Sequence, residues 1–439
     1  MTVRRTRWTS GALAAAFVLV AGCTNGPGPA RPAPVGSASA GSPAPTASTG
    51  AHPQSPTSTP TTSPATASSP AATPKSRIRL LSPKRALSGP SRSTDLPGMP
   101  ANADHRDIYA AAGANALTSR QRRFPKYAYV PHNRSGDVWV IDQRTHAVVR
   151  KCRVGIEVQH VVPSYDMTQL YATDDVGNKV RVIDPSTGRC GRTIAVVDPY
   201  NMYFTPDGRY AISVAEERRQ LIWYNTISWK VHDITPVPGC AGVDHADFSA
   251  DGRTAVFTCE FAGAVVVVDV LSHKVLRKVT MPVVNRMMGP QDIKLAPDGS
   301  AYYIADSDSN GVWMLNGAAT KVLRHIPTGK GAHGLYLSRN AKLLYVTNRL
   351  EGSVSVLDAY TGRVRTRWVL PGGGSPDMGN VSADGKQLWV SGRYDDVVYV
   401  IDTRNGHLLS KIPVGNGPHG LALMPLPGRY SLGHTGITR

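Results

Sequence analysis

The stretch Leu344-Tyr345-Val346-Thr347-Asn348, followed by Val354-Ser355-Val356-Leu357-Asp358, reads as two short strands joined by a tight connection. Aromatic and β-branched side chains such as those of Tyr345, Val346 and Thr347 favour a pleated strand. Asp358 precedes a turn, where a short carboxylate accepts hydrogen bonds from backbone N–H groups two residues on. This two-strand unit recurs along the chain, and its recurrence predicts the fold.

The second strand of the unit ends in Asp or Asn and occurs seven times at intervals of 41 to 47 residues. The terminal residues are Asp142, Asp184, Asn225, Asp269, Asn316, Asp358 and Asp402. We interpret the five aspartates among them as turn residues. A further short strand lies between these copies, and in four of the repeats an Asp-Gly turn closes it, at 207–208, 251–252, 298–299 and 384–385. A repeat of this length with several short strands predicts a β-propeller. Apolar residues recur at every second position, which is the period of a strand and argues against helical repeats.

The ends of the repeat region predict how the ring closes. The first recognisable strand, 127–130, is the second strand of a blade, and the last, 418–424, is an extra first strand. Pairing these two completes a seventh blade and removes two exposed sheet edges. We therefore expect an all-β fold, a seven-bladed β-propeller of four-stranded blades over 126–426, followed by a C-terminal tail over 427–439.

The pentad at 344–348 matches the signature of the YVTN family of seven-bladed propeller repeat proteins, and the chain resembles that family over 127–424. The resemblance implies the architecture. It leaves function open, because similar propellers include surface antigens, lactone hydrolases and binders of nucleic acids or cofactors.

The first 22 residues have the pattern of a secretory signal peptide. Three arginines precede an apolar run, and small residues lead directly to Cys23. This order resembles a bacterial lipobox, which implies that Cys23 is acylated and holds the protein at the cell membrane on its extracytoplasmic side. The alternative is an ordinary signal peptide with an incidental cysteine.

Two segments separate this signal from the propeller. Residues 23–75 are a Pro/Ser/Thr/Ala-rich linker, which we expect to be a disordered tether, and 76–125 are basic and mostly irregular. Residues 1–125 contribute +11 of the formal net charge of +18, so contact with an anionic membrane or wall polymer is one interpretation and a solvated linker is the other. Basic runs interleaved with aromatic residues are lacking, which argues against nucleic acid as a partner. We expect a monomer.

Four cysteines remain for an exported, disulfide-permitting compartment. Cys240 precedes the first strand of one blade and Cys259 ends the second strand of the same blade, so we predict a disulfide between them. The pairing of Cys152 and Cys190 stays open. Neither Cys-x-x-Cys nor Cys-x-x-Cys-His occurs, which argues against a Cys-x-x-Cys metal or redox site and against covalent haem attachment.

The first strands of the blades line the channel, so their opening residues should form a ring at one channel mouth. The predicted ligand-binding residues at this mouth are His160, Asn201, His245, Asp292, His333, Asp377 and His419. Imidazole and carboxylate groups suit divalent transition metals, so a divalent metal or haem is a candidate cofactor. The alternative is that the channel is filled with water, which tolerates polar residues without any bound ligand.

No short enzyme signature is present: the chain lacks Gly-x-Ser-x-Gly, His-Glu-x-x-His and a P-loop. We therefore predict a membrane-anchored ligand-binding or protein-interaction module. The alternative is a propeller enzyme, either a lactonase-like hydrolase or a metal- or haem-handling protein that uses the His/Asp ring. Whether the protein is an enzyme is left open.

Overall fold

The computed structural model describes residues 95–282 and 288–439. The expected signal peptide 1–22, the lipid attachment at Cys23 and the linker 23–75 lie outside the described residues. None of the helices in the described part of the chain is long and apolar enough to cross a membrane.

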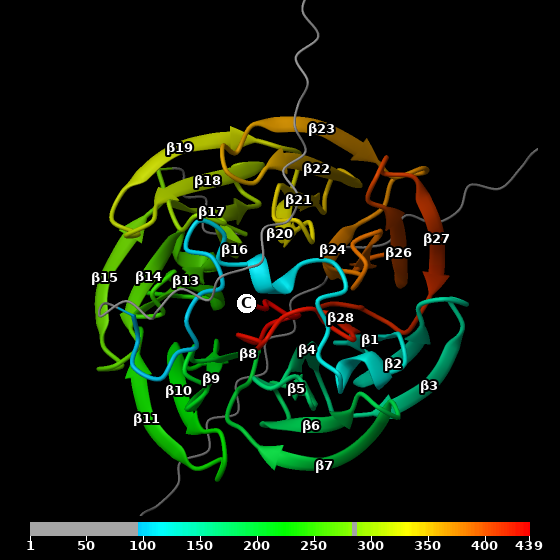
Figure 1. Cartoon of the computed structure of the whole chain (residues 1–439), viewed down its shortest axis with the longest axis horizontal. Coiled ribbons are helices and arrows are strands. Elements are labelled where there is room, and N and C mark those ends of the chain that lie inside the picture. Colours follow the sequence, from blue (N-terminus) through cyan, green and yellow to red (C-terminus); the bar gives the residue numbers. More distant parts are fainter. Residues whose placement is uncertain (1–94, 283–287) are drawn as a thin grey trace, which may run out of the picture. The chain divides into compact units, whose positions relative to one another are not determined.

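Seven four-stranded antiparallel sheets are arranged as blades around a central channel (Figure 1), which confirms the predicted all-β, seven-bladed propeller. Six blades are continuous in sequence. The first three are β4 (Val158–Pro163), β5 (Leu170–Asp174), β6 (Lys179–Asp184) and β7 (Arg189–Ala195); β8 (Asn201–Phe204), β9 (Tyr210–Ala215), β10 (Gln220–Asn225) and β11 (Val231–Pro236); and β12 (Val243–Phe248), β13 (Thr254–Cys259), β14 (Ala264–Asp269) and β15 (Val275–Thr280). The next three are β16 (Pro290–Leu295), β17 (Ala301–Asp306), β18 (Gly311–Asn316) and β19 (Val322–Pro327); β20 (Ala332–Leu337), β21 (Leu343–Asn348), β22 (Ser353–Asp358) and β23 (Val364–Val369); and β24 (Pro376–Val381), β25 (Gln387–Gly392), β26 (Val397–Asp402) and β27 (Leu408–Pro413).

The seventh blade joins the two ends of the repeat region. Its strands are β1 (Tyr127–His132), β2 (Asp137–Asp142), β3 (Val148–Arg153) and the late strand β28 (Ala422–Met424). β28 pairs antiparallel with β1, with Tyr127 opposite Met424 and Tyr129 opposite Ala422. The late strand β28 therefore closes the ring by pairing with β1, as the sequence predicts, and β1 is not left as an open edge.

Burial follows the position of each strand within a blade. Inner strands such as β16 and β24 are buried at every residue, whereas outer strands such as β3 and β11 are mostly exposed. The turn role of the strand-terminal acids is also observed: an Asp142 carboxylate oxygen accepts the N–H groups of Arg144 and Thr145, both at 2.8 Å. The inner strands thus form the walls of the channel.

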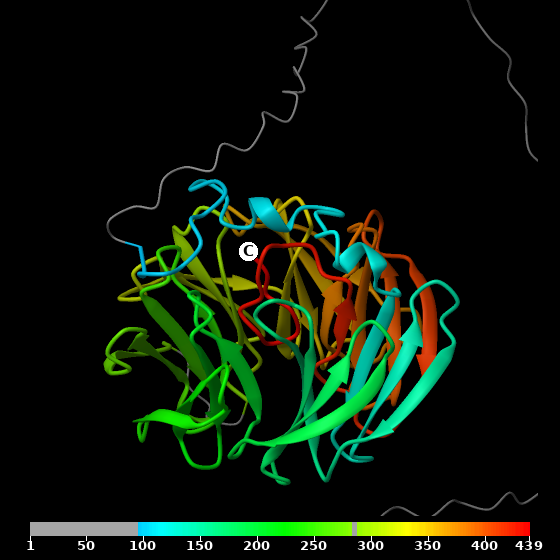
Figure 2. The same cartoon turned by 60° about the horizontal axis from the view of Figure 1, so that its bottom comes forward.

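The two ends of the channel differ. The mouth face carries the loops between second and third strands and the connections between blades; the Asp-Gly face carries the Asp-Gly turns. Residues 95–124 run across the Asp-Gly face with two short 3₁₀ helices, η1 (Ala110–Ala112) and η2 (Gln121–Arg123) (Figure 2). A third, η3 (Glu260–Ala262), lies on the mouth face. Backbone bonds from Leu96 to Asp251, from Ile108 to Pro297 and from Asn115 to Ala383, at 2.7–2.8 Å, tie this irregular segment to three blades.

Residues 427–439, expected from the sequence to be a tail, fill the channel interior (Figures 1 and 2). Tyr430, Leu432 and Ile437 are buried in one apolar cluster with residues of the surrounding blades. The segment runs beside β8, where the Phe204 N–H donates to the Leu432 carbonyl at 2.9 Å and the His434 N–H to the Met202 carbonyl at 2.8 Å. Because β8 is the inner edge strand of its blade, its channel-facing N–H and C=O groups have no partner within the sheet, and this segment supplies partners for them.

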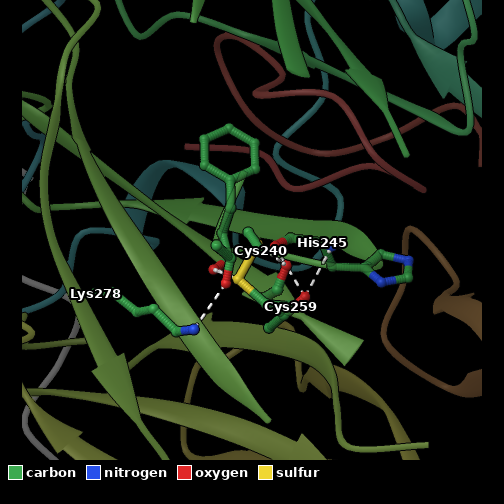
Figure 3. Close-up of a disulfide and its surroundings, with 7 residues drawn as sticks. Cys240, His245, Cys259 and Lys278 are labelled. Atoms are coloured by element: carbon green, nitrogen blue, oxygen red, sulfur yellow. Dashed lines mark hydrogen bonds between the residues drawn. A yellow bond between two sulfur atoms is a disulfide. The ribbon is translucent and has the colours of Figure 1, made fainter. Parts of the chain in front are cut away.

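Two disulfides cross-link the propeller. Cys240 is joined to Cys259, with Cα atoms 4.8 Å apart, beside the strand that carries His245 (Figure 3). Cys152 of β3 is joined to Cys190 of β7, which links the outer strands of neighbouring blades. The Cys240–Cys259 bridge closes a segment that contains the start of β12, with Asp244 and His245.

Candidate functional site

The predicted mouth residues lie at irregular points of the inner strands. The pairing of β4 with β5, β12 with β13, β16 with β17, β20 with β21 and β24 with β25 shifts register where His160, His245, Asp292, His333 and Asp377 occur. Such bulges bend a strand and re-aim its side chains, here at the channel.

Threonine hydroxyls on the second strands satisfy the backbone N–H groups that the bulges release. The His160 N–H donates to Thr173 Oγ1 at 3.0 Å, and the His245 N–H to Thr258 Oγ1 at 2.9 Å. The Gly334 N–H donates to Thr347 Oγ1 at 2.7 Å in the same manner. The repeated threonine therefore fixes the backbone from which the mouth side chains project.

Three buried histidines form the first group, and one of them comes from the channel-filling segment. His160, His245 and His434 are each at most 1% exposed, and one ring nitrogen of each lies within 4.8 Å of the others. His160 Nε2 is 3.3 Å from His245 Nε2. Metal–nitrogen bonds of about 2.0–2.1 Å at tetrahedral angles place two ligand nitrogens about 3.3–3.4 Å apart, so this pair already has the spacing of two ligands on one ion.

Neighbouring groups orient these imidazole rings. His160 Nδ1 lies 2.9 Å from the Tyr200 carbonyl, which fixes the proton on Nδ1 and leaves the Nε2 lone pair free. His245 Nδ1 lies 2.5 Å from a carboxyl oxygen of Asp244, whose side chain is 1% exposed. This contact lacks hydrogen-bond geometry, so His160 is the ring whose non-ligating nitrogen has the oxygen partner that usually supports a metal-binding histidine.

His434 is held by the two remaining predicted residues of this half of the ring. Asn201 Nδ2 lies 3.0 Å from His434 Nδ1, and Asp292 Oδ1 lies 3.8 Å from His434 Nε2. The Asn201 amide oxygen accepts the Met202 N–H at 2.8 Å, which sets the amide orientation. In this arrangement the His434 proton is on Nε2, so binding an ion through that nitrogen requires the Asn201 amide to turn over.

All three rings of this group are held in the neutral form that binds metals. Burial, together with the neighbouring His245, holds the pKa of His160 well below its usual range. Burial lowers the pKa of His245 to about 4, and burial with His245 and His160 holds the pKa of His434 well below its usual range. A neutral imidazole offers a lone pair at one nitrogen; in His160 this is Nε2, whereas in His434 it is Nδ1, so His434 must change tautomer before it coordinates through Nε2.

The second group is centred on the Asp377 carboxylate. His333 Nδ1 lies 3.0 Å and Arg349 Nη1 3.2 Å from Asp377 Oδ1, while His419 Nε2 lies 3.5 Å and Arg393 Nη1 3.7 Å from Asp377 Oδ2. Although burial opposes it, the neighbouring His333 and Arg349 hold the pKa of Asp377 well below its usual range. Two guanidinium groups beside one carboxylate disfavour a metal cation here, although the residues satisfy the distance criterion for one.

The two groups adjoin across the channel. The His160 and His419 ring centroids are 4.7 Å apart, and His419 Nδ1 lies 3.1 Å from Gln159 Oε1. The structure therefore brings all seven predicted residues to one mouth but divides them into a metal-competent histidine group and an ion-pair group.

A hollow of about 450 Å³ opens beside this mouth. Gln159 forms part of its wall, and acidic side chains of neighbouring loops form most of the rest. Burial and the adjacent Asp244 raise the pKa of Glu216 to about 9, and burial with Glu157 raises that of Asp175 to about 7. These partly exposed carboxyl groups are thus crowded together in the wall of the hollow.

His434 was missed by the sequence prediction because it lies outside the repeat. The repeat period identifies residues that each blade contributes, whereas His434 reaches the channel only through the return of 427–439. The available signal was the apolar pair Leu432 and Ile437 in a glycine-rich stretch, which marks a segment able to pack.

Comparison with known proteins agrees with this architecture. Residues 287–427 match the YNCE-like beta-propeller family. The chain is 29% identical over 149 residues to YncE of Salmonella typhi, covering 33% of this chain and 41% of that protein, and 29% identical over 144 residues to YncE of Escherichia coli K12, covering 32% and 40%. The match thus spans about two-fifths of the length of these relatives. Together with the seven blades of the structure, this match supports a YVTN-type seven-bladed propeller.

Solved structures resemble the fold at low sequence identity. A functionally unknown protein from Desulfotomaculum acetoxidans has a TM-score of 0.58 at 14% identity, covering 68% of this chain and 98% of that one. Hydrazine synthase of Kuenenia stuttgartiensis has a TM-score of 0.52 at 19% identity, covering 61% and 90%. The dihydro-heme d1 dehydrogenase NirN has a TM-score of 0.52 at 13% identity, covering 70% and 77%. These structural similarities support the fold alone.

Proposed function

We propose that this propeller is a ligand-binding module whose ligand is a divalent transition-metal ion held by His160, His245 and His434. One observation carries the proposal: three buried, neutral imidazoles converge within 4.8 Å, with two ring nitrogens 3.3 Å apart. Three histidines leave a fourth tetrahedral position for a water molecule or another ligand. Zinc, copper and nickel are the ions that such an all-nitrogen set suits.

The test is a metal titration of the purified, metal-free protein by calorimetry, with metal content measured after dialysis. One ion per chain is expected, and His160→Ala should lower the affinity by at least about tenfold. His407→Ala, which removes an exposed histidine in a turn, is the control and should bind like the wild type. Circular dichroism verifies that each variant is folded.

A further variant separates the two groups of the mouth. His333→Gln alters the Asp377 group and leaves the three histidines in place. If His333→Gln abolishes metal binding while His160→Ala retains it, the ion belongs to the Asp377 group and the proposed ligand set is wrong.

Membrane anchoring belongs to the same proposal. Cys23 directly follows an apolar run that ends in small residues, the arrangement of an acylation site. Cys23→Ser should release the protein from membranes into the soluble extracytoplasmic fraction. Equal membrane retention of both forms after a high-salt wash would contradict a lipid anchor.

A further inference from the structure

Arg349 and Arg393 reach the same point of the channel mouth from adjacent blades. Arg349 follows β21 and Arg393 follows β25. Their guanidinium groups lie 3.2 and 3.7 Å from different oxygens of Asp377. The Arg349 side chain is 6% exposed and that of Arg393 is 19% exposed, so one arginine is enclosed and the other extends toward solvent.

Both arginines have donors without a hydrogen-bond partner. Arg349 Nε and Arg393 Nη1 are buried atoms that form no hydrogen bond within 95–282 and 288–439. A buried donor without a partner is costly, and native proteins satisfy nearly all of them with protein, water or ligand. Asp377 Oδ2, 3.7 Å from Arg393 Nη1, is likewise without a hydrogen bond, so the contacts to Asp377 leave both guanidinium groups with donors free for a further acceptor.

The charge balance indicates that this acceptor is negatively charged. Two permanently charged guanidinium groups face one carboxylate, that of Asp377. Asp244 and Glu260 also lie in the electrostatic surroundings of these arginines, but among the described residues neither carboxyl forms an ion pair with Arg349 or Arg393. By direct contact, two guanidinium groups therefore share a single carboxylate, and an oxyanion is the acceptor that a guanidinium group binds best.

We infer that Arg349 and Arg393 bind the oxyanion group of a small ligand, a carboxylate or a phosphate, at the mouth face. The planar guanidinium fork matches both groups, and two forks from different blades can grip one oxyanion. The acidic hollow involves other blades, β4–β7 and β8–β11, so the anionic group is placed on the arginine side of the mouth. This site is separate from the three histidines and does not depend on the metal proposal.

The experiment titrates the full, metal-free chain with sodium acetate and, separately, sodium phosphate in calorimetry, at an ionic strength kept constant with chloride. At least one of the two is expected to bind, and the preferred one identifies the oxyanion. Arg393→Gln should weaken that binding at least tenfold. The matched control is Arg367→Gln, which removes an exposed arginine paired with Glu351 at 2.6 Å and should bind like the wild type.

A second measurement on the wild-type protein keeps the inference testable if Arg393→Gln fails to fold. Phenylglyoxal modifies accessible arginines, and mass spectrometry maps the sites. The oxyanion should protect Arg393 but not Arg367. Equal modification of Arg393 with and without oxyanion, or unchanged binding by folded Arg393→Gln, would overturn the inference. Metal binding is measured in a separate titration with chloride as the only anion, so failure of one proposal does not imply failure of the other.

Discussion

At the scale of single residues, the mouth contains two kinds of ionisable group. Some are stabilised in their charged form by neighbours of opposite charge, and others have a pKa shifted by their surroundings toward the uncharged form. Asp377 belongs to the first kind, because two arginines and two histidines surround its carboxylate. Glu216 belongs to the second, because burial and the nearby Asp244 raise its pKa to about 9. Shifted pKa values of this kind are typical of binding sites, where some stability is lost in favour of function.

Glu216 gives a prediction about pH. Its folded pKa lies above the ordinary value of 4.5, so its contribution to stability is fully present below about pH 4.5 and is lost as the pH rises toward 9. Glu216→Gln does not titrate. It should therefore melt about 2–4 °C or more above the wild type at pH 8, with the difference shrinking toward pH 4.5.

Thermal unfolding of the metal-free protein followed by circular dichroism checks this. Glu217→Gln is the control, since the neighbouring Glu217 side chain is exposed, and it should change the melting temperature little at either pH. A melting difference between Glu216→Gln and the wild type that does not vary with pH would contradict the prediction.

At the scale of strands and turns, most of the structure could be predicted because each blade repeats the same local chemistry. Asp358, like its six counterparts, ends a strand and caps a turn, and its carboxylate accepts the Thr361 N–H at 2.9 Å. The histidines could be assigned to one mouth because strand order determines the end of the channel at which each inner strand begins.

What could not be predicted depends on contacts outside the repeat. No periodicity places His434, and nothing local distinguishes Asp377 beside two arginines from Asp292 beside a histidine. The division of the mouth into a histidine group and an ion-pair group is a property of the closed ring. The pairing of Cys152 with Cys190 also joins two blades, so a single repeat gives no information about it.

The two disulfides allow a prediction at this scale. Cys240–Cys259 closes a segment of 19 residues that contains Asp244 and His245, whereas Cys152–Cys190 closes one of 38 residues. In the chain-entropy model each bridge stabilises the fold by about 3–4 kcal/mol. Replacing either pair with serine should therefore lower the free energy of unfolding by a similar amount.

Metal affinity should respond to only one of the two pairs. Cys240→Ser/Cys259→Ser frees the connection before β12 and should weaken metal binding, while Cys152→Ser/Cys190→Ser should bind like the wild type. Urea unfolding and calorimetric titration measure the two effects. Equal metal affinity in both double variants would show that the Cys240–Cys259 bridge does not position His245.

At the scale of the whole molecule, three segments distant in sequence meet on one buried charge. Asp247 of β12 accepts a hydrogen bond from Arg439 at 3.1 Å and from the Tyr109 hydroxyl at 3.2 Å. Arg439 also donates to the Phe248 carbonyl at 2.6 Å. The Asp-Gly face, its covering segment and the channel-filling segment are thus coupled, while the mouth face is where the two proposed ligands bind.

Two truncations distinguish closing the ring from filling it. Deleting 427–439 leaves β28 paired with β1 but removes His434 and the Arg439 partner of buried Asp247, a loss of about 3–5 kcal/mol for the broken pair. Deleting 418–439 also removes β28 and exposes the edge of β1, so its unfolding should be broader and begin at lower temperature. The shorter deletion should retain the far-ultraviolet spectrum of the propeller yet lose metal binding. Metal binding that survives the loss of 427–439 would exclude His434 as a ligand, and identical melting of the two truncated forms would show that β28 does not hold the ring closed.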